Sequence, residues 1–539
     1  MPFKFDALKN NYPLSRKVIF AKNGMVAASA PLAAQAGLDI LKKGGNAMDA
    51  AIATAACLTV VEPASNGLGS DAFALVWSGG KLYGLNASGP SANALDADAL
   101  RKKHGSIMPK YGWDPVTVPG AVSAWAEMSK KFGNLPLKEL LSPAISYAAE
   151  GFPVSPVISR LWTEAFELYR NTEEFKHASL QNWFVTFTPN GKAPNPGDFV
   201  KLPDHAATLT ELAETGCESF YRGKIANKID AFSKATGGAL RKEDLAAYNA
   251  QWVEPIAANY KGYTVHEIPP NGQGIIALMA LNILEKMDID TFGTANTLHK
   301  QIEAMKLAFI DGQRYIADPR FMKITVEQLL SKDYAGKRRA VITEKAIMPK
   351  AGDPASGGTV YFCTADAEGN MVSFIQSNYM GFGSGVVVPG TGISMQNRGN
   401  NFSLDPDMEN CAAPNKKPYH TIIPGFLSKD GKAVGPFGVM GGFMQPQGHV
   451  QVIMNTIDFG MNPQEALDAP RWQWTGGKNV DIERRFDAGV TEQLLRRGHA
   501  VTIPVEPIAL GRGQIIWRSE EGVLAGGSES RTDGTVAAW

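Results

Sequence analysis

The sequence has few cysteines, no excess of either charge and no long hydrophobic run, and each absence excludes a class of protein. Its 539 residues include four cysteines, at positions 57, 217, 363 and 411. They are too few and too widely spaced for a dense disulfide framework or a cysteine-based metal site. Lysine plus arginine and aspartate plus glutamate both number 53, so no net field attracts nucleic acid or an acidic membrane. The sequence therefore predicts neither partner, and no metal.

Apolar segments long enough for a membrane are also missing. The first nine residues carry charges every few positions, so we expect no secretory signal or anchor there. Residues 50–61 form the longest mildly apolar run, but these twelve residues are too few for a bilayer span of about 20. Their alanine and threonine content predicts a buried helix instead. These features favour a cytoplasmic enzyme.

Motifs of several common enzyme classes are absent. The sequence contains no G-x-S-x-G, H-E-x-x-H or G-x-x-x-x-G-K-[ST] pattern, which argues against the corresponding serine hydrolases, zinc proteases and phosphate loops. Residues 381–385 (GFGSG) half match a dinucleotide fingerprint, but no helix is expected after them. We therefore expect no cofactor.

The most informative feature that is present is a threonine at a flexible junction. Gly357 and Gly358 precede Thr359, and residues 359–365 and 371–376 are rich in β-branched and aromatic residues, which predicts two strands joined by a turn. The glycines permit backbone angles that bend the peptide bond into Thr359 toward its own hydroxyl. An ordinary loop entering a sheet is the alternative, and the residues after the junction decide against it.

The glycine-rich continuation matches a known pattern. From residue 359 to residue 402 the chain resembles, without a gap, the start of the small subunit of γ-glutamyltranspeptidases. Other signatures of that family occur in order, at residues 24–29, 44–51, 118–122, 269–274 and 441–442. The resemblance implies that the chain cuts itself between Gly358 and Thr359. It would yield a large-subunit segment, 1–358, and a small-subunit segment, 359–539, with a homodimer of these left open.

The resemblance also implies an α+β fold, the four-layer αββα sandwich of N-terminal nucleophile hydrolases, in one compact body. The residue patterns agree, because helical runs gather early and strands gather around Thr359. Helices are expected at residues 32–43, 47–61, 122–131, 138–150, 206–215, 275–286 and 297–317, and strands at 73–77, 262–267, 359–365, 371–376, 422–427 and 433–439.

The chemistry follows from what Thr359 offers. A hydroxyl is a weak nucleophile at neutral pH and needs an adjacent base. Once the Gly358–Thr359 bond is cut, the freed α-amino group, with an ordinary pKa of about 7.7 to 8.0, supplies that base. By the resemblance, the hydroxyl of Ser377 orients the nucleophile, and the backbone N–H groups of Gly441 and Gly442 form the oxyanion hole.

The donor pocket departs from the family pattern. There an arginine binds the donor's α-carboxylate, an acidic residue binds its α-amino group and two serines complete the carboxylate site. The matching positions here are Asn86, Asn401 and His420–Thr421, and Arg398 stands where glutamine is usual. The lost charged contacts would weaken recognition of a zwitterionic donor by roughly two to four powers of ten.

The sequence therefore predicts a threonine amidohydrolase or acyltransferase that transfers an acyl group from a small-molecule amide to water or an amine. Its donor is expected to carry a carboxylate without an adjacent ammonium, as in oxamate or a glutaryl group, with Arg398 binding that carboxylate. One alternative is a true γ-glutamyl hydrolase or transpeptidase acting on glutathione. Another is an uncleaved binding protein without activity.

Overall fold

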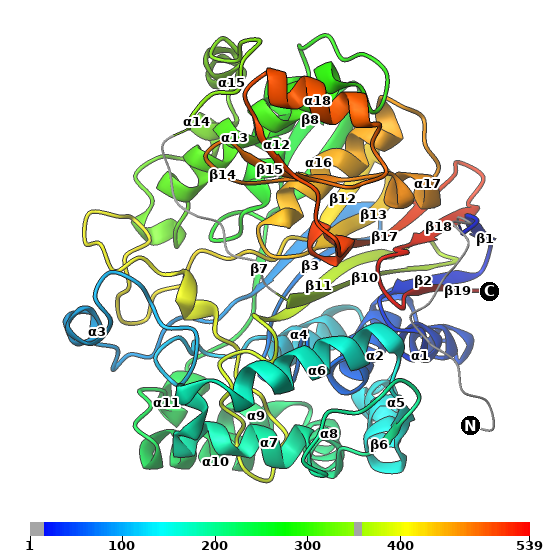
Figure 1. Cartoon of the computed structure of the whole chain (residues 1–539). Helices are drawn as coiled ribbons and strands as arrows, with labels where there is room; N and C mark the ends of the chain where they lie inside the picture. Colours follow the sequence, from blue (N-terminus) through cyan, green and yellow to red (C-terminus); the bar gives the residue numbers. More distant parts are fainter. Residues whose placement is uncertain (1–15, 350–357) are drawn as a thin grey trace.

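Two seven-stranded antiparallel sheets lie face to face at the centre of the molecule (Figure 1). The computed structural model describes residues 16–349 and 358–539. One sheet runs in the order β19-β2-β10-β11-β3-β4-β7 and holds the junction strand. Its strands are β19 (Thr535–Ala538), β2 (Gly24–Ala28), β10 (Gly358–Asp366), β11 (Met371–Tyr379), β3 (Asp71–Ser78), β4 (Lys81–Ala87) and β7 (Gln251–Val253).

The second sheet has the order β1-β18-β17-β13-β12-β9-β8. Its strands are β1 (Ile19–Ala21), β18 (Leu524–Ser528), β17 (Arg512–Arg518), β13 (Lys432–Met440), β12 (Gly425–Lys429), β9 (Tyr263–Glu267) and β8 (Ile256–Tyr260). Both sheets take strands from each side of the Gly358–Thr359 bond. Two segments produced by cleavage there would therefore remain interleaved in one hydrogen-bonded structure.

Helices cover the outer face of each sheet, as Figure 1 shows. The sheet with β10 packs against α1 (Pro31–Lys42) and α2 (Ala47–Val61), and α5 (Leu137–Glu150) and α8 (Pro203–Thr215) continue that layer. The other sheet packs against α12 (Gly274–Leu284) and α16 (Met444–Ile457), with α13 (Ala295–Tyr315) beside them. The remaining helices of eight or more residues are α3 (Ala97–His104), α4 (Ala121–Phe132), α6 (Pro156–Arg170), α10 (Lys224–Ala235), α15 (Lys332–Arg339) and α18 (Ala488–Arg496).

Apolar side chains fill three layers of core. Between the sheets, Phe73, Tyr361 and Ile375 from one sheet meet Phe426 and Ile516 from the other. Each sheet also packs against its helices through a larger apolar cluster, one cluster for each sheet. The expected four-layer αββα arrangement is thus confirmed.

Helix α2 shows how the sequence produces this packing. The Asn46 side chain accepts hydrogen bonds from the backbone N–H groups of Met48 and Asp49, at 2.9 and 3.0 Å, while Asp49 accepts one from the Asn46 N–H. This reciprocal cap fixes the start of the helix. Every residue of α2 is buried, so the apolar run is a core helix, as expected. More broadly, no helix in the described ranges is both long and apolar enough to cross a membrane.

The sequence expectations differ from the structure in two instructive places. The strand expected at residues 422–427 begins only at Gly425, because Pro424 has no N–H to donate to a ladder. Helix α16 was not expected, since Pro446 and Gly448 lie inside it and both residues disfavour helix interiors.

Candidate active site

The threonine at the junction pairs with the hydroxyl that the sequence predicted beside it. Thr359 lies near the start of β10, where the register with β11 is irregular between Gly358 and Val360. Its Oγ1 lies 3.0 Å from Ser377 Oγ. The backbone N–H of Tyr379 donates to the Ser377 oxygen at 2.8 Å. This second bond fixes the Ser377 oxygen, so the pair has a defined position in the sheet.

Tyr379 links this pair to a buried arginine. Its φ is +77°, a left-handed conformation that costs a bulky residue about 1–3 kcal/mol and tends to occur at functional sites. The Tyr379 ring lies 4.5 Å from the Arg398 guanidinium carbon, within the range of a cation–π contact. The strained backbone therefore places an aromatic surface under Arg398.

Arg398 is fully buried and only partly satisfied. Its Nη1 donates to Thr421 Oγ1 at 2.6 Å, and its Nε lies 3.7 Å from Asp71 Oδ2. Neither Nε nor Nη2 has a hydrogen-bond partner among the described residues. Burial lowers the pKa of Arg398 to about 10, opposed by the nearby Asp71 carboxylate, so the guanidinium stays charged at neutral pH. A buried cation with free donors is costly unless an anion completes its surroundings.

Asp71 and His420 form the other side of this cluster. Asp71 lies opposite Ser377 in the ladder between β3 and β11, and His420 Nε2 lies 3.0 Å from Asp71 Oδ2. The Ile422 N–H points at His420 Nδ1 at 3.4 Å, which places the imidazole proton on Nε2, donating to Asp71. Burial lowers the pKa of His420 well below its ordinary value and raises that of Asp71 to about 7. His420 is therefore neutral and orients Asp71.

Sequence reasoning did not identify Asp71. An acidic residue after the glycine-containing loop at residues 67–70, at the start of the expected strand 73–77, was the available signal. Its position directly across the sheet from Ser377 depends on a pairing between distant strands, which one sequence does not reveal.

Asn401 lies close to Arg398 in the short 3₁₀ helix Arg398–Asn401. Its carbonyl accepts a hydrogen bond from Asn410 Nδ2 at 2.6 Å, whereas its own side-chain Nδ2 is buried and has no partner in the described parts of the chain. The 3₁₀ helix that begins at Arg398 thus carries a second buried donor without a hydrogen-bond partner among the described residues. Donors without acceptors suit an anionic ligand group better than an ammonium.

Asn86 lies elsewhere. Its Nδ2 donates to Asn271 Oδ1 at 3.0 Å, and its Oδ1 lies 3.4 Å from Lys417 Nζ. These residues line a cavity of about 620 Å³ whose lining does not include Thr359 or Arg398. The structure therefore brings Ser377, Arg398, Thr421 and His420 together around Asp71, but places Asn86 in the neighbouring cavity.

Gly441 and Gly442 precede helix α16 and have φ values of +137° and +60°. Gln273 Nε2 donates to the Gly442 carbonyl at 2.9 Å and to the Thr421 carbonyl at 2.6 Å. This side chain ties the glycine loop to the loop that contacts Arg398. The two glycines lie just before Phe443, the N-cap residue of α16, and their role in an oxyanion hole stays a prediction.

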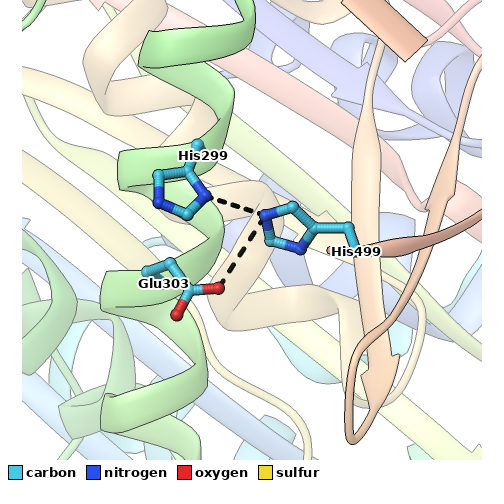
Figure 2. A group of neighbouring side chains, drawn as sticks. All are labelled: His299, Glu303 and His499. Atoms are coloured by element: carbon cyan, nitrogen blue, oxygen red, sulfur yellow. Dashed lines mark hydrogen bonds and ion pairs between the residues drawn. The ribbon is translucent and has the colours of Figure 1, made fainter. Parts of the chain in front are cut away.

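A separate cluster offers metal-type ligands. His299 Nδ1, His499 Nε2 and a Glu303 carboxylate oxygen lie within 4.8 Å of one another (Figure 2). The ammonium of Lys306, however, lies 2.7 Å from Glu303 Oε1 and 3.5 Å from His499 Nδ1. It already supplies the positive charge that a metal would bring.

The chain is similar to several known proteins. The family model for gamma-glutamyltranspeptidase matches residues 33–539. The chain is 38% identical to the glutathione hydrolase-like YwrD proenzyme of Bacillus subtilis, over 97% of this chain and 99% of that one, and 34% identical to the oxamate amidohydrolase proenzyme of Klebsiella pneumoniae, over 96% and 98%. The crystal structure of cephalosporin acylase from Bacillus halodurans superposes with a TM-score of 0.97 at 59% identity, covering 100% of this chain and 99% of that one.

Proposed function

Because this chain belongs to the gamma-glutamyltranspeptidase family, we propose that Thr359 is its nucleophile and that the Gly358–Thr359 bond is its autocleavage junction. The chain is an enzyme of the N-terminal nucleophile hydrolase type, an autoprocessed amidohydrolase or acylase that acts on small-molecule amides as two self-derived subunits. In our proposal those subunits are residues 1–358 and 359–539.

Maturation uses the hydroxyl that later performs catalysis. Thr359 Oγ1 attacks the Gly358 carbonyl carbon, and the acyl group moves from nitrogen to oxygen. Water then hydrolyses the resulting ester, freeing the Gly358 carboxylate and the α-amino group of Thr359. The 3.0 Å contact with Ser377 supports this step, because it gives the Thr359 hydroxyl a defined orientation. In the uncleaved chain Thr359 and Arg398 are both fully buried, so substrate reaches them only after rearrangement.

Turnover then proceeds by acyl-transfer chemistry. The α-amino group takes the Thr359 hydroxyl proton as the oxygen attacks the substrate carbonyl. The N–H groups of Gly441 and Gly442 stabilise the oxyanion, a contribution of about 2.7–4 kcal/mol per donor in comparable enzymes. The amine leaves with the proton, and water or an acceptor amine releases the acyl group.

The donor carries a carboxylate but no adjacent ammonium. The observation that supports this is Arg398, whose buried Nε and Nη2 have no hydrogen-bond partner in the described chain. Two intervening residues, Tyr379 and Ser377, connect Arg398 to Thr359. A carboxylate on the acyl chain would satisfy both donors in a fork geometry. Oxamate-like and glutaryl-like donors have this character.

A γ-glutamyl donor is the alternative, with Asn401 accepting a hydrogen bond from the ammonium. It fits less well, because Asn401 replaces a charged partner with a neutral one. Asp71 Oδ2 already faces His420 and Arg398, and Asp71 Oδ1, which has no hydrogen-bond partner among the described residues, is the acceptor that such an ammonium would need. An added ammonium beside Arg398 would also bring two cations together.

Three matched anilides test this assignment: glutaryl anilide, its neutral analogue glutaramide anilide, and γ-glutamyl anilide. We expect Arg398→Met to lower kcat/KM for glutaryl anilide by about ten- to hundredfold, corresponding to about 1.5–3 kcal/mol. The neutral analogue should be nearly unaffected. Equal losses on both would assign Arg398 a structural role, and a strong wild-type preference for γ-glutamyl anilide would favour the alternative donor.

A further inference from the structure

The cavity beside the active site contains a cation that forms no direct ion pair, although the carboxylates of Asp318 and Asp71 lie near enough to favour its charged form. The cavity has a volume of about 620 Å³, within the range of small-molecule sites. Lys417 lines it, and its Nζ lies 3.0 Å from Gln251 Oε1 and 3.4 Å from Asn86 Oδ1, both neutral amide oxygens. No carboxylate lies within ion-pair distance of this ammonium in the described ranges. Burial lowers the pKa of Lys417 to about 8, so it remains mostly protonated at pH 7.

The other basic group in the cavity is already neutralised. Arg320 donates from Nε and Nη2 to the two oxygens of Asp318, at 3.0 and 2.7 Å. Asp318 also accepts the backbone N–H of Lys417 at 3.0 Å, but not its ammonium. Two acidic residues, Glu243 and Asp244, line the cavity as well. The Asp244 carboxylate accepts hydrogen bonds from the backbone N–H groups of Asn93 and Arg241. Glu243 is exposed to solvent. Lys417 is thus the cavity cation that lacks a direct ion pair, and an anionic group of a ligand would supply one.

The cavity and the active site share a wall. The Asn271 carbonyl, on the cavity side, accepts the His420 N–H at 2.9 Å. Asn86, near the end of strand β4, lines the cavity, and the backbone N–H of Gly89 in the loop that follows helps lower the pKa of the Asp71 carboxyl. Lys417 lies three residues before His420 in the same loop. One ligand could therefore have its scissile amide at Thr359 and its distal end in this cavity.

We propose that Lys417 binds a carboxylate on the amine side of the scissile amide, carried by the leaving amine or by an acceptor amine such as an amino acid. The inference rests on the proposed function, in which Arg398 serves the acyl side. Two separated cations then recognise the two ends of one substrate. Asn86 and Gln251 hold the Lys417 ammonium in place, which gives Asn86 a positioning role here.

The test uses four anilides that combine two acyl groups with two amines. The acyl group is glutaryl or glutaramide, and the amine is aniline or 3-aminobenzoate. We expect Lys417→Met to lower kcat/KM about tenfold or more for both 3-aminobenzoate amides and to leave both aniline amides within twofold. Lys417→Arg should keep most of the preference for 3-aminobenzoate amides over aniline amides. Arg320→Met is the control, because it removes a cavity cation that Asp318 already neutralises.

The outcomes separate this proposal from the proposed function. The loss in kcat/KM caused by Arg398→Met should depend on the acyl group and not on the amine. The loss caused by Lys417→Met should depend on the amine and not on the acyl group. Equal effects of Lys417→Met on all four amides, or no effect on any, would overturn the Lys417 site while leaving the Arg398 result intact. Ligand-observed NMR with 3-aminobenzoate and aniline on the cleavage-blocked Thr359→Ala chain provides a readout without turnover. Unchanged 3-aminobenzoate binding after Lys417→Met in that background would also overturn the site.

Discussion

Two buried charged clusters in this molecule differ in how fully their polar atoms are paired. At the active site, Arg398 and Asp71 approach only to 3.7 Å, and two of the guanidinium nitrogens have no partner among the described residues. In the second cluster, Lys306 lies 2.7 Å from Glu303, and His299 Nδ1 lies 2.8 Å from His499 Nε2. Figure 2 draws His299, Glu303 and His499 of this cluster. Similar burial and similar residue types therefore produce an incomplete site in one place and a complete one in the other.

Proton positions explain why the second cluster needs nothing more. The Thr343 carbonyl lies 2.7 Å from His299 Nε2, so the proton is on that nitrogen and Nδ1 accepts the proton of His499 Nε2. His499 Nδ1 is then unprotonated, and its lone pair faces the Lys306 ammonium. Glu303 Oε2 accepts the backbone N–H of Ile347 at 3.1 Å. Every polar side-chain atom of this cluster is satisfied, which is the usual state of buried polar groups.

The difference suggests different roles for the two clusters: a structural contact for the second cluster and ligand binding for the active-site cluster. The second cluster joins residues near the end of the described large-subunit segment, Thr343 and Ile347, to His499 of the small-subunit segment. If the chain is cut as proposed, this cluster would link the two segments. The active-site cluster instead keeps unpaired donors, a cost to folding that a bound anion would offset.

The largest effect is expected from removing the proposed nucleophile, which leaves both clusters intact. Thr359→Ala should abolish cleavage and turnover, whereas Thr359→Ser should retain part of each, because serine keeps the hydroxyl but loses the methyl that restricts χ1. Denaturing gels and N-terminal sequencing measure cleavage, and the small fragment of the unaltered chain should begin Thr-Val-Tyr-Phe. Cleavage of the Thr359→Ala chain after Gly358 at the normal rate would refute the assignment of the nucleophile.

The sequence predicted the part of the site that depends on local order. Ser377 and the Gly441–Gly442 loop were identified by resemblance to contiguous family motifs, whereas the strands at Thr359 and Ser377 follow from composition and a short turn. The structure places the Thr359 and Ser377 hydroxyls in contact, and the catalytic roles stay predictions.

The features that the sequence did not predict depend on contacts across long separations. Asp71 meets Ser377 through a ladder between β3 and β11, and Lys417 meets Asn86 across a cavity. The cluster of His299, Glu303 and His499 joins residues 200 positions apart. Composition and periodicity report local structure, so such pairings become visible only once the chain is folded.

A second prediction concerns the loss of the ion pair in the cluster of His299, Glu303, Lys306 and His499. Glu303→Gln leaves the Lys306 ammonium buried without its carboxylate, which should lower the free energy of unfolding by about 3–5 kcal/mol. The paired change Glu303→Leu/Lys306→Met should recover much of that loss, because no uncompensated charge remains. Chemical denaturation of the cleavage-blocked Thr359→Ala chain measures both. A double variant less stable than Glu303→Gln would contradict the pairing, and the acyl preference of mature enzyme should not change in either.

The last prediction is a pH dependence of stability from Asp71. Its pKa of about 7 in the folded chain exceeds the value near 3.9 expected when unfolded. Between these values the folded chain binds the extra proton, so stability falls as pH rises from about 4 to 7, by at most ~1.4 kcal/mol per pH unit, and is level above that window. Asp71→Asn cannot titrate, so its unfolding free energy relative to the Asp71 chain should increase as pH rises through this window. Denaturation midpoints at pH 4.5 and 7.5 in the Thr359→Ala background measure the difference. A constant difference would mean that Arg398 and His420 keep Asp71 ionised throughout, and the active-site cluster would then be a closed ion pair like that of Glu303 and Lys306.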